Sequence, residues 1–301
     1  MTLSGELAAL AAAAAWAVST VLFRRLGTAI PPLPLNLCKG ALAMPLLGAV
    51  LLLSPGARAG AELWGVGLLA LSGVVGIGVG DTAFFAALNR LGERRTILMA
   101  ETLAPPMTTG IALVVLSEWL GPVAVAGIVV TIAGVAWVVV ERSAETRVDP
   151  RDARRGVLCG LLAAGCQAVG AVMSRAVLTQ TEIDPWLSSF VRIGGGVAAL
   201  LVWMPIAGQP YTPAALRSRR VWPGVVAATL VGTFVGLYFQ QLSLQRVSAG
   251  VSQTLGATST LRVLPIVALQ GERLTVRACL GAAVAVAGVA MLVLTSGAAG
   301  E

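Results

Sequence analysis

The sequence predicts an all-α polytopic membrane protein, in which ten transmembrane helices form two inverted five-helix repeats. Three observations predict this fold class. The 301 residues are 57% hydrophobic and only 12% charged, whereas a soluble domain carries about 25% charge. The apolar residues gather in stretches of about 20 residues, which is the length that crosses the hydrocarbon core as a helix. The two halves of the chain also match each other in sequence.

The apolar stretches follow one another with short polar breaks between them. The ten expected helices span residues 5–23, 33–53, 63–88, 97–117, 121–141, 156–178, 186–207, 221–242, 249–269 and 274–295. Between the fifth and the sixth lies the one long charged stretch. We therefore expect a first repeat at residues 1–141, a charged linker at 142–155 and a second repeat at 156–301. The first stretch follows no basic region typical of a cleaved signal peptide, so we expect it in the mature chain.

An internal match indicates the repeat. The segment SEWLGPVAVAGIVVTIAGVA at residues 117–136 corresponds to GERLTVRACLGAAVAVAGVA at residues 271–290. The same comparison places Lys39 opposite Arg192. Each copy holds five spans, which is an odd number, so two copies joined by a linker that does not cross must enter the bilayer in opposite senses.

The charge distribution indicates a membrane orientation and gives no sign of a nucleic-acid partner. The chain has 21 Lys and Arg against 14 Asp and Glu, and it has no His. Most arginines lie in short breaks that fall on one face of the membrane, together with those of the linker. The positive-inside rule makes this face cytoplasmic and puts both termini outside. The arginines of these breaks are Arg24, Arg25, Arg90, Arg94, Arg95, Arg217, Arg219, Arg220 and Arg273.

Cofactor and metal patterns are missing from the sequence. The four cysteines lie inside apolar stretches without CxxC spacing, so we expect free thiols and no metal site. The sequence has no GxxxxGK[ST] motif, so energy would come from a solute or ion gradient and not from ATP. We expect no cofactor.

The residues at the ends of the fourth and ninth stretches carry a family resemblance. The paired Glu118-x-Leu120 and Glu272-x-Leu274, the glycines seven apart in the stretches that follow, and the ten-helix plan resemble the EamA-type branch of the drug/metabolite transporter superfamily. The resemblance covers essentially the full chain. It implies a secondary carrier that works by alternating access, with a central cavity lined by helices 1, 3 and 4 and their counterparts 6, 8 and 9. Members commonly keep both termini in the cytoplasm, so the orientation stays open.

Three ionisable residues lie at similar depths in the first half. Lys39 is the only lysine of the chain and lies early in the second stretch, Asp81 lies near the end of the third, and Glu101 lies near the start of the fourth. Charged groups inside a membrane are costly and tend to face a cavity or a partner. The cluster either binds a polar solute, carries a proton or gates the pathway, or it only neutralises itself so that the helices can pack. Without His, a proton relay would use these carboxylates.

The second half offers a different set of polar residues. Leu237 takes the place of Asp81, and Tyr238, Gln240 and Gln241 follow it. Arg192 either clasps a carboxylate or phosphate, or bonds the glutamines and the backbone, with the second role preferred. Arg262 lies deep in the ninth stretch, one turn from the hydroxyl of Ser259, and is the foremost candidate for an anionic group of the solute.

Proline and two further residues complete the candidates. Pro105 and Pro106 in the fourth stretch and Pro265 in the ninth remove helical hydrogen bonds at equivalent places of the two repeats. Such positions indicate either a binding site with broken helices or ordinary kinks. Trp16 and Gln167 occupy matching places in the first and sixth stretches and face either the interior or the lipid.

The sequence as a whole predicts a multi-pass secondary transporter of the cell (inner or plasma) membrane. Its expected partners are a small-molecule solute, membrane lipid and, as a coupling ion, the proton, and we expect a monomer or a weak homo-oligomer. The solutes implied are small organic metabolites, such as amino acids or drugs, that the protein exports. One alternative is a flippase of a lipid-linked substrate. A membrane-embedded enzyme acting on lipid-linked substrates is less expected, because the chain has single acids in the membrane and no His.

Overall fold

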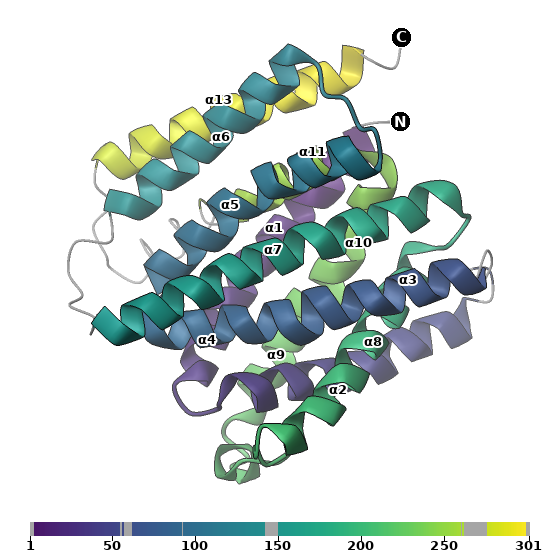
Figure 1. The fold of residues 1–301 in the computed structure, drawn as a ribbon, viewed down its shortest axis with the longest axis vertical. Coiled ribbons are helices and arrows are strands. Elements are labelled where there is room, and N and C mark those ends of the chain that lie inside the picture. Colours follow the sequence, from purple (N-terminus) through teal and green to yellow (C-terminus); the bar gives the residue numbers. More distant parts are fainter. Residues whose placement is uncertain are drawn as a thin grey trace.

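The described part of the chain is entirely helical in its regular structure. A computed structural model describes residues 3–54, 56, 62–91, 93–141, 150–259, 261 and 276–298, and its helices form the layered bundle of Figure 1. The helices of the first half are α1 (Leu3–Gly27), α2 (Pro32–Leu53), α3 (Leu63–Gly73), η2 (Val74–Asp81), α4 (Thr82–Leu91), α5 (Glu93–Val115) and α6 (Pro122–Glu141). Those of the second half are α7 (Pro150–Gln180), α8 (Pro185–Ile206), η3 (Ala214–Arg217), α9 (Trp222–Ala228), η4 (Thr229–Val235), α10 (Gly236–Arg246), α11 (Ala249–Ala257) and α13 (Val276–Ala298).

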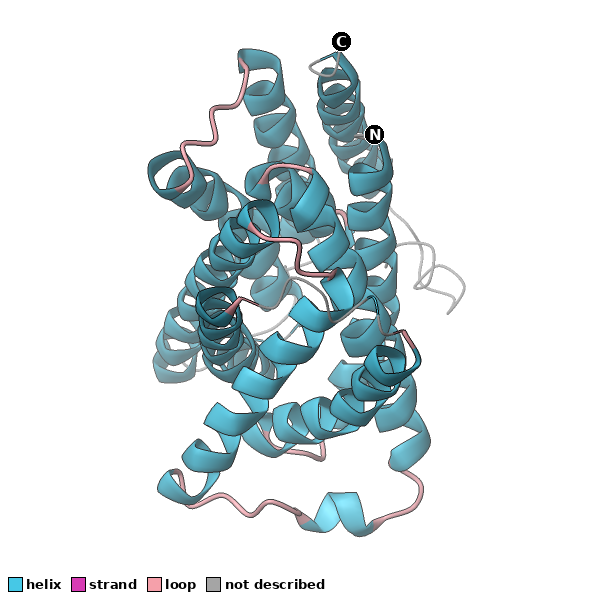
Figure 2. Cartoon of the chain, turned by 90° about the vertical axis from the view of Figure 1, so that its right-hand side faces the viewer, coloured by secondary structure: helices cyan, strands magenta, loops and turns pink. Residues whose placement is uncertain are grey.

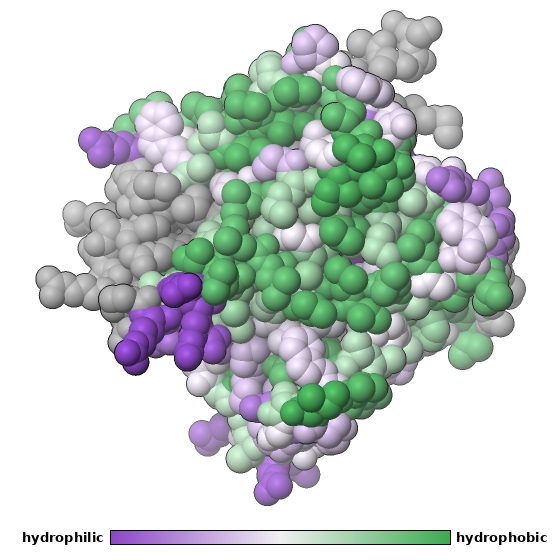
Figure 3. Space-filling model, in the orientation of Figure 1, coloured by the Kyte–Doolittle hydropathy of each residue, from purple (hydrophilic) through white to green (hydrophobic). Residues whose placement is uncertain are grey.

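The lengths and surfaces of these helices fit a membrane. Six described segments are long and apolar enough to cross one, and shorter apolar helices cover 99–115, 122–137 and 279–292. Large apolar side chains point outward; Leu53, Val114 and Trp119, for example, are each more than 80% exposed. Hydrophobic residues cover the middle of the face in Figure 3, and hydrophilic residues gather toward its edges. These findings confirm an all-α polytopic membrane protein.

The two halves are inverted relative to each other. In α2 and its counterpart α8, Gly40 lies against Val197 while Gly48, further along, lies against Phe190. Residue numbers rise along one helix as they fall along the other, so the two helices are antiparallel. Equivalent helices of parallel copies would run in the same direction, and the predicted inverted arrangement is therefore confirmed.

The last helices of the two repeats pack in the same way. Gly127 of α6 lies against Gly288 of α13, whereas Gly134 lies against Gly281, and the two helices lie side by side in Figure 1. A Cβ added at Gly134 would collide with the backbone of Ala285. Small residues on both helices allow this close approach, as is usual between membrane helices.

The third helix of each repeat contains a π-helical segment in its middle. The α3–η2–α4 rod carries it at Val74–Asp81 and the α9–η4–α10 rod at Thr229–Val235. In each segment a side chain from another helix donates to a backbone carbonyl: Asn36 Nδ2 to Ile77 O at 2.6 Å, and Trp16 Nε1 to Gly232 O at 3.2 Å. π-segments are rare and are frequent at functional sites.

Some element boundaries differ from the expected ones. The sixth helix, α7, begins at Pro150 and not at residue 156, so residues 150–155 of the expected linker are helical. A proline at the first helical position is pre-organised for a helix, and Asp152 in the first turn complements the positive end of the helix dipole. The connection from α8 to α9, with the 3-10 turn η3, lies at the lower edge of the bundle in Figure 2. Residues 260 and 262–269 of the expected ninth helix lie outside the described residues.

Candidate functional site

A cavity lies in the centre of the bundle, between the two repeats. Its lining comes from α1, η2, α4 and α5 of the first repeat and from α7, η4, α10 and α11 of the second, with a single described residue each from α2 and α8. The cavity volume is about 160 Å³, several times the roughly 10–15 Å³ that one buried water needs by the same measure. The helices expected from the family resemblance line it, joined by the second helix of each repeat.

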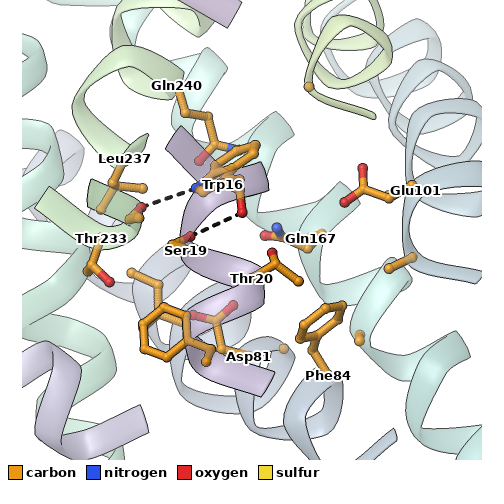
Figure 4. Close-up of a pocket in the computed structure, with 18 of the residues that line it drawn as sticks. Trp16, Ser19, Thr20, Asp81, Phe84, Glu101, Gln167, Thr233, Leu237 and Gln240 are labelled. Carbon is orange, nitrogen blue, oxygen red and sulfur yellow. Dashed lines mark hydrogen bonds between the residues drawn. The ribbon is translucent and has the colours of Figure 1, made fainter. Parts of the chain in front are cut away.

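The lining combines aromatic, amide and charged side chains. The rings are Trp16, Phe23, Phe84 and Phe85, the amides are Gln167, Gln240 and Gln253, and the charged residues are Lys39, Asp81, Glu101 and Arg192. Figure 4 shows Glu101 on the opposite side of the cavity from the polar side chains of α1. A site of this kind can hold a solute that has both an apolar and a charged part.

Lys39 and Asp81 form an ion pair on the wall of the cavity. The Lys39 ammonium donates a hydrogen bond to Oδ2 of Asp81. It also lies 5.9 Å from the ring centre of Phe23 and 5.2 Å from that of Phe85, where a cation is attracted by the face of the ring. The ammonium thus has a partner of opposite charge and two aromatic neighbours.

Glu101 belongs to the same cavity and has a different partner. Its carboxyl group forms a side-chain hydrogen bond with Ser259, which is buried at the end of the described part of the ninth helix. Lys39, Asp81 and Glu101 therefore line one cavity, although the hydrogen bonds of the described residues separate them into a pair and a single acid.

Arg192 is the most deeply buried charged residue among the described residues of the cavity lining. Its side chain is 2% exposed, and its Nε and Nη1 atoms have no hydrogen-bond partner within the described chain. Its guanidinium occupies a slot beside Gly76 of η2 and Gly170 of α7: a Cβ at these positions would lie 3.2 and 3.4 Å from Nη2. The other polar residues expected near it behave differently. Gln240 lines the cavity, Gln241 accepts a hydrogen bond from Ser188, and Tyr238 stacks on Trp186.

The proline candidates divide into two groups. Pro105 and Pro106 lie inside α5, which continues through both without a break, and Pro105 lines the cavity. Thr109 donates its hydroxyl to the carbonyl of Pro105 at 2.9 Å. Arg262 and Pro265 lie outside the described residues, so their expected roles stay predictions.

The sequence did not identify several residues that line the cavity. Ser19, Thr20 and Gln253 line the cavity, but nothing in their spacing separates them from other polar residues of a membrane helix. Trp16 and Gln167 both line the cavity. Their matching positions in the two repeats could have identified them as lining residues. Among the described residues no group of three or more His, Cys, Asp or Glu could hold a metal ion.

A clasp around Arg175 joins helices of both repeats. Arg175 Nε donates to Glu118 Oε1 at 2.6 Å, and its Nη1 donates to the carbonyl of Leu244 at 2.7 Å. Glu118 Oε2 accepts a further hydrogen bond from the amide of Ala249 at 2.9 Å. The clasp joins α7 to the residues after α5 and to the turn between α10 and α11. A buried apolar cluster that includes Ala112 lies beside it.

Known proteins share both the fold and the sequence pattern. One solved structure, described only as the crystal structure of a protein, matches with a TM-score of 0.80 and 19% sequence identity over 98% of each chain, so the two folds are alike. A comparison with curated proteins finds no match. The EamA-like transporter family matches the chain twice, over residues 3–140 and 154–294. These two matches cover both repeats, and the chain belongs to the EamA-like transporter family.

Proposed function

We propose that this protein is a secondary transporter that exports small organic metabolites, such as amino acids or drugs, across the cell membrane by alternating access. The observation that carries the proposal is the central cavity, which helices of both inverted repeats line. Transporters with this plan expose a fixed central site to one side and then to the other, as one repeat rocks against its partner.

The chemistry of the cavity supports a small amphiphilic solute. The aromatic rings offer apolar area, while the amides and charged groups offer hydrogen bonds. Asp81 and Glu101 are the described carboxylates of the lining, so they are the groups that would carry a coupling proton. The clasp of Arg175 and Glu118 would then be the closed mouth, which must open during the transport cycle.

Flux through liposomes tests the proposal directly. Purified protein is reconstituted, a panel of labelled amino acids and drug-like solutes is applied along an imposed gradient, and uptake is compared with protein-free liposomes. We expect at least one solute to cross faster with the protein. We expect Thr20→Trp, which fills the cavity, to stop this flux.

A bulky residue on the lipid-facing surface is the matched control. Val114 is 81% exposed on the outside of α5, so Val114→Trp adds the same ring without touching the cavity. Unchanged flux in Val114→Trp and lost flux in Thr20→Trp support transport through this cavity. Flux that equals the protein-free rate for the whole panel, or full flux in Thr20→Trp, contradicts it.

A further inference from the structure

We infer that Arg192 is the docking group for a carboxylate of the transported solute. The inference rests on the proposed transport function and specifies which chemical group of the solute meets which residue. The solute is then a carboxylate-bearing molecule whose remaining part faces the aromatic and amide lining.

The first step is the unmet hydrogen-bonding capacity of Arg192. Its side chain lines the cavity and is 2% exposed, yet Nε and Nη1 have no partner among the described residues. Buried polar atoms are nearly always hydrogen-bonded, and a buried charge without a partner is far more costly than an uncharged group. Nε and Nη1 lie on different edges of the planar guanidinium, so each can donate a separate, charge-assisted hydrogen bond to a carboxylate oxygen.

The second step is the difference between the two repeats. Lys39 and Arg192 are equivalent residues of the second helix in each repeat, and both reach the cavity. Lys39 is neutralised by Asp81 of its own repeat. The position equivalent to Asp81 in the second repeat is Leu237, which cannot accept a hydrogen bond. Arg192 therefore lacks the acid that the repeat would supply.

The third step is the occupation of the other acids of the lining. Asp81 interacts electrostatically with Arg192, but its Oδ2 accepts the hydrogen bond of Lys39. Glu101 hydrogen-bonds Ser259. Neither described carboxylate forms a hydrogen bond with the guanidinium, so that place is left for a carboxylate from outside the protein.

The fourth step is the space provided for the guanidinium. Gly76 and Gly170 flank Nη2: a Cβ at Gly76 would be in tight contact with it at 3.2 Å, and one at Gly170 would be in ordinary contact at 3.4 Å. The backbone of Arg192 is also held, because a Cβ at Gly73 would collide with its carbonyl. The side chain is thus fixed in place before a solute arrives, which reduces the cost of ordering it on binding.

Matched pairs of solutes test the inference by flux. Each pair consists of an amino acid and its primary amide, which have the same number of heavy atoms and differ in the anionic charge. We expect the wild-type protein to move the acid faster than the amide, and we expect Arg192→Gln to lose this preference. Arg246→Gln, which removes an exposed arginine at the end of α10, should keep it. Equal or faster flux of the amides in the wild-type protein, or a preserved preference in Arg192→Gln, overturns the inference.

Thermal stability gives a second readout that needs no solute. An unpaired buried arginine destabilises the empty protein, so we expect Arg192→Met to raise the melting temperature or leave it unchanged. Arg175 is the matched control, because it is hydrogen-bonded to Glu118 and Leu244, and Arg175→Met should lower the melting temperature. An equal loss in both variants makes Arg192 a structural residue and overturns the inference. A panel in which no solute moves counts against the transport proposal, and the two melting temperatures still decide the role of Arg192.

Discussion

The ion pair of Lys39 and Asp81 shows how single residues are stabilised inside the bundle. Removing one partner leaves the other charge without compensation, so Lys39→Met and Asp81→Asn should each lower the free energy of unfolding by up to about 3 kcal/mol. The double variant removes both charges, and we expect it to recover most of this loss. Unfolding in mixed micelles, followed by helical circular dichroism, measures the three values. A double variant that loses the sum of the two single losses would show that the residues act independently.

The glycine beside the guanidinium of Arg192 can be tested in the same way. Alanine at an open helical position stabilises by about 0.5–1 kcal/mol relative to glycine. Gly67 of α3 has open space around its missing Cβ, so Gly67→Ala should show this gain. Gly76→Ala should show none of it, because its Cβ would lie 3.2 Å from Arg192 Nη2 and displace the guanidinium. Equal melting temperatures for the two variants would show that the slot is not tight.

Within the elements, the helices were predictable and their π-helical middles were not. Residues 63–88 were expected as one helix because they form a continuous apolar stretch, and the structure has a helical rod at 63–91. The π-segment at 74–81 changes the hydrogen-bond pattern without changing hydropathy, so composition carries no sign of it. The partners Asn36 and Trp16, which bond the two π-segments, come from other helices. Such contacts follow from tertiary packing and are invisible in a hydropathy pattern.

The clasp between elements carries a prediction about gating. Arg175→Gln and Glu118→Gln should each loosen the junction of α7 with the α10–α11 turn, with a coupling energy of about 0.5–3 kcal/mol in the double-mutant cycle. The buried Ala112, replaced by cysteine in a background without native cysteines, reports on opening. We expect thiol-reactive reagents to label it faster in Arg175→Gln than in the parent. The same labelling rate in both, with Arg246→Gln as control, would show that the clasp does not close this mouth.

For the whole molecule, the repeat predicted the architecture and part of the site. The matching glycines of the fifth and tenth helices indicated two related units, and the antiparallel packing of α6 and α13 is the direct consequence. The similar depths of Lys39, Asp81 and Glu101 along their helices predicted that the three residues meet, and they do line one cavity. Depth could not predict which of them form an ion pair, because that depends on side-chain rotamers and on the rotation of each helix. The proposed role of Arg192 rests on what surrounds it. Only the structure shows that, among the described residues, none accepts a hydrogen bond from its Nε or Nη1.

The orientation of the whole molecule in the membrane is the last prediction. Exposed basic residues gather at the start of α7, where Arg151, Arg154 and Arg155 lie close together. The positive-inside rule places this end in the cytoplasm and both termini, at the opposite end, outside. Green fluorescent protein fused at the C-terminus should therefore be dark, and alkaline phosphatase at the same place should be active. Insertion of the fluorescent protein between residues 145 and 146 should give the reverse result. A fluorescent C-terminal fusion would contradict this orientation and show that the protein lies the other way round in the membrane. The clasp would then lie at the cytoplasmic mouth, and the cavity would open to the outside.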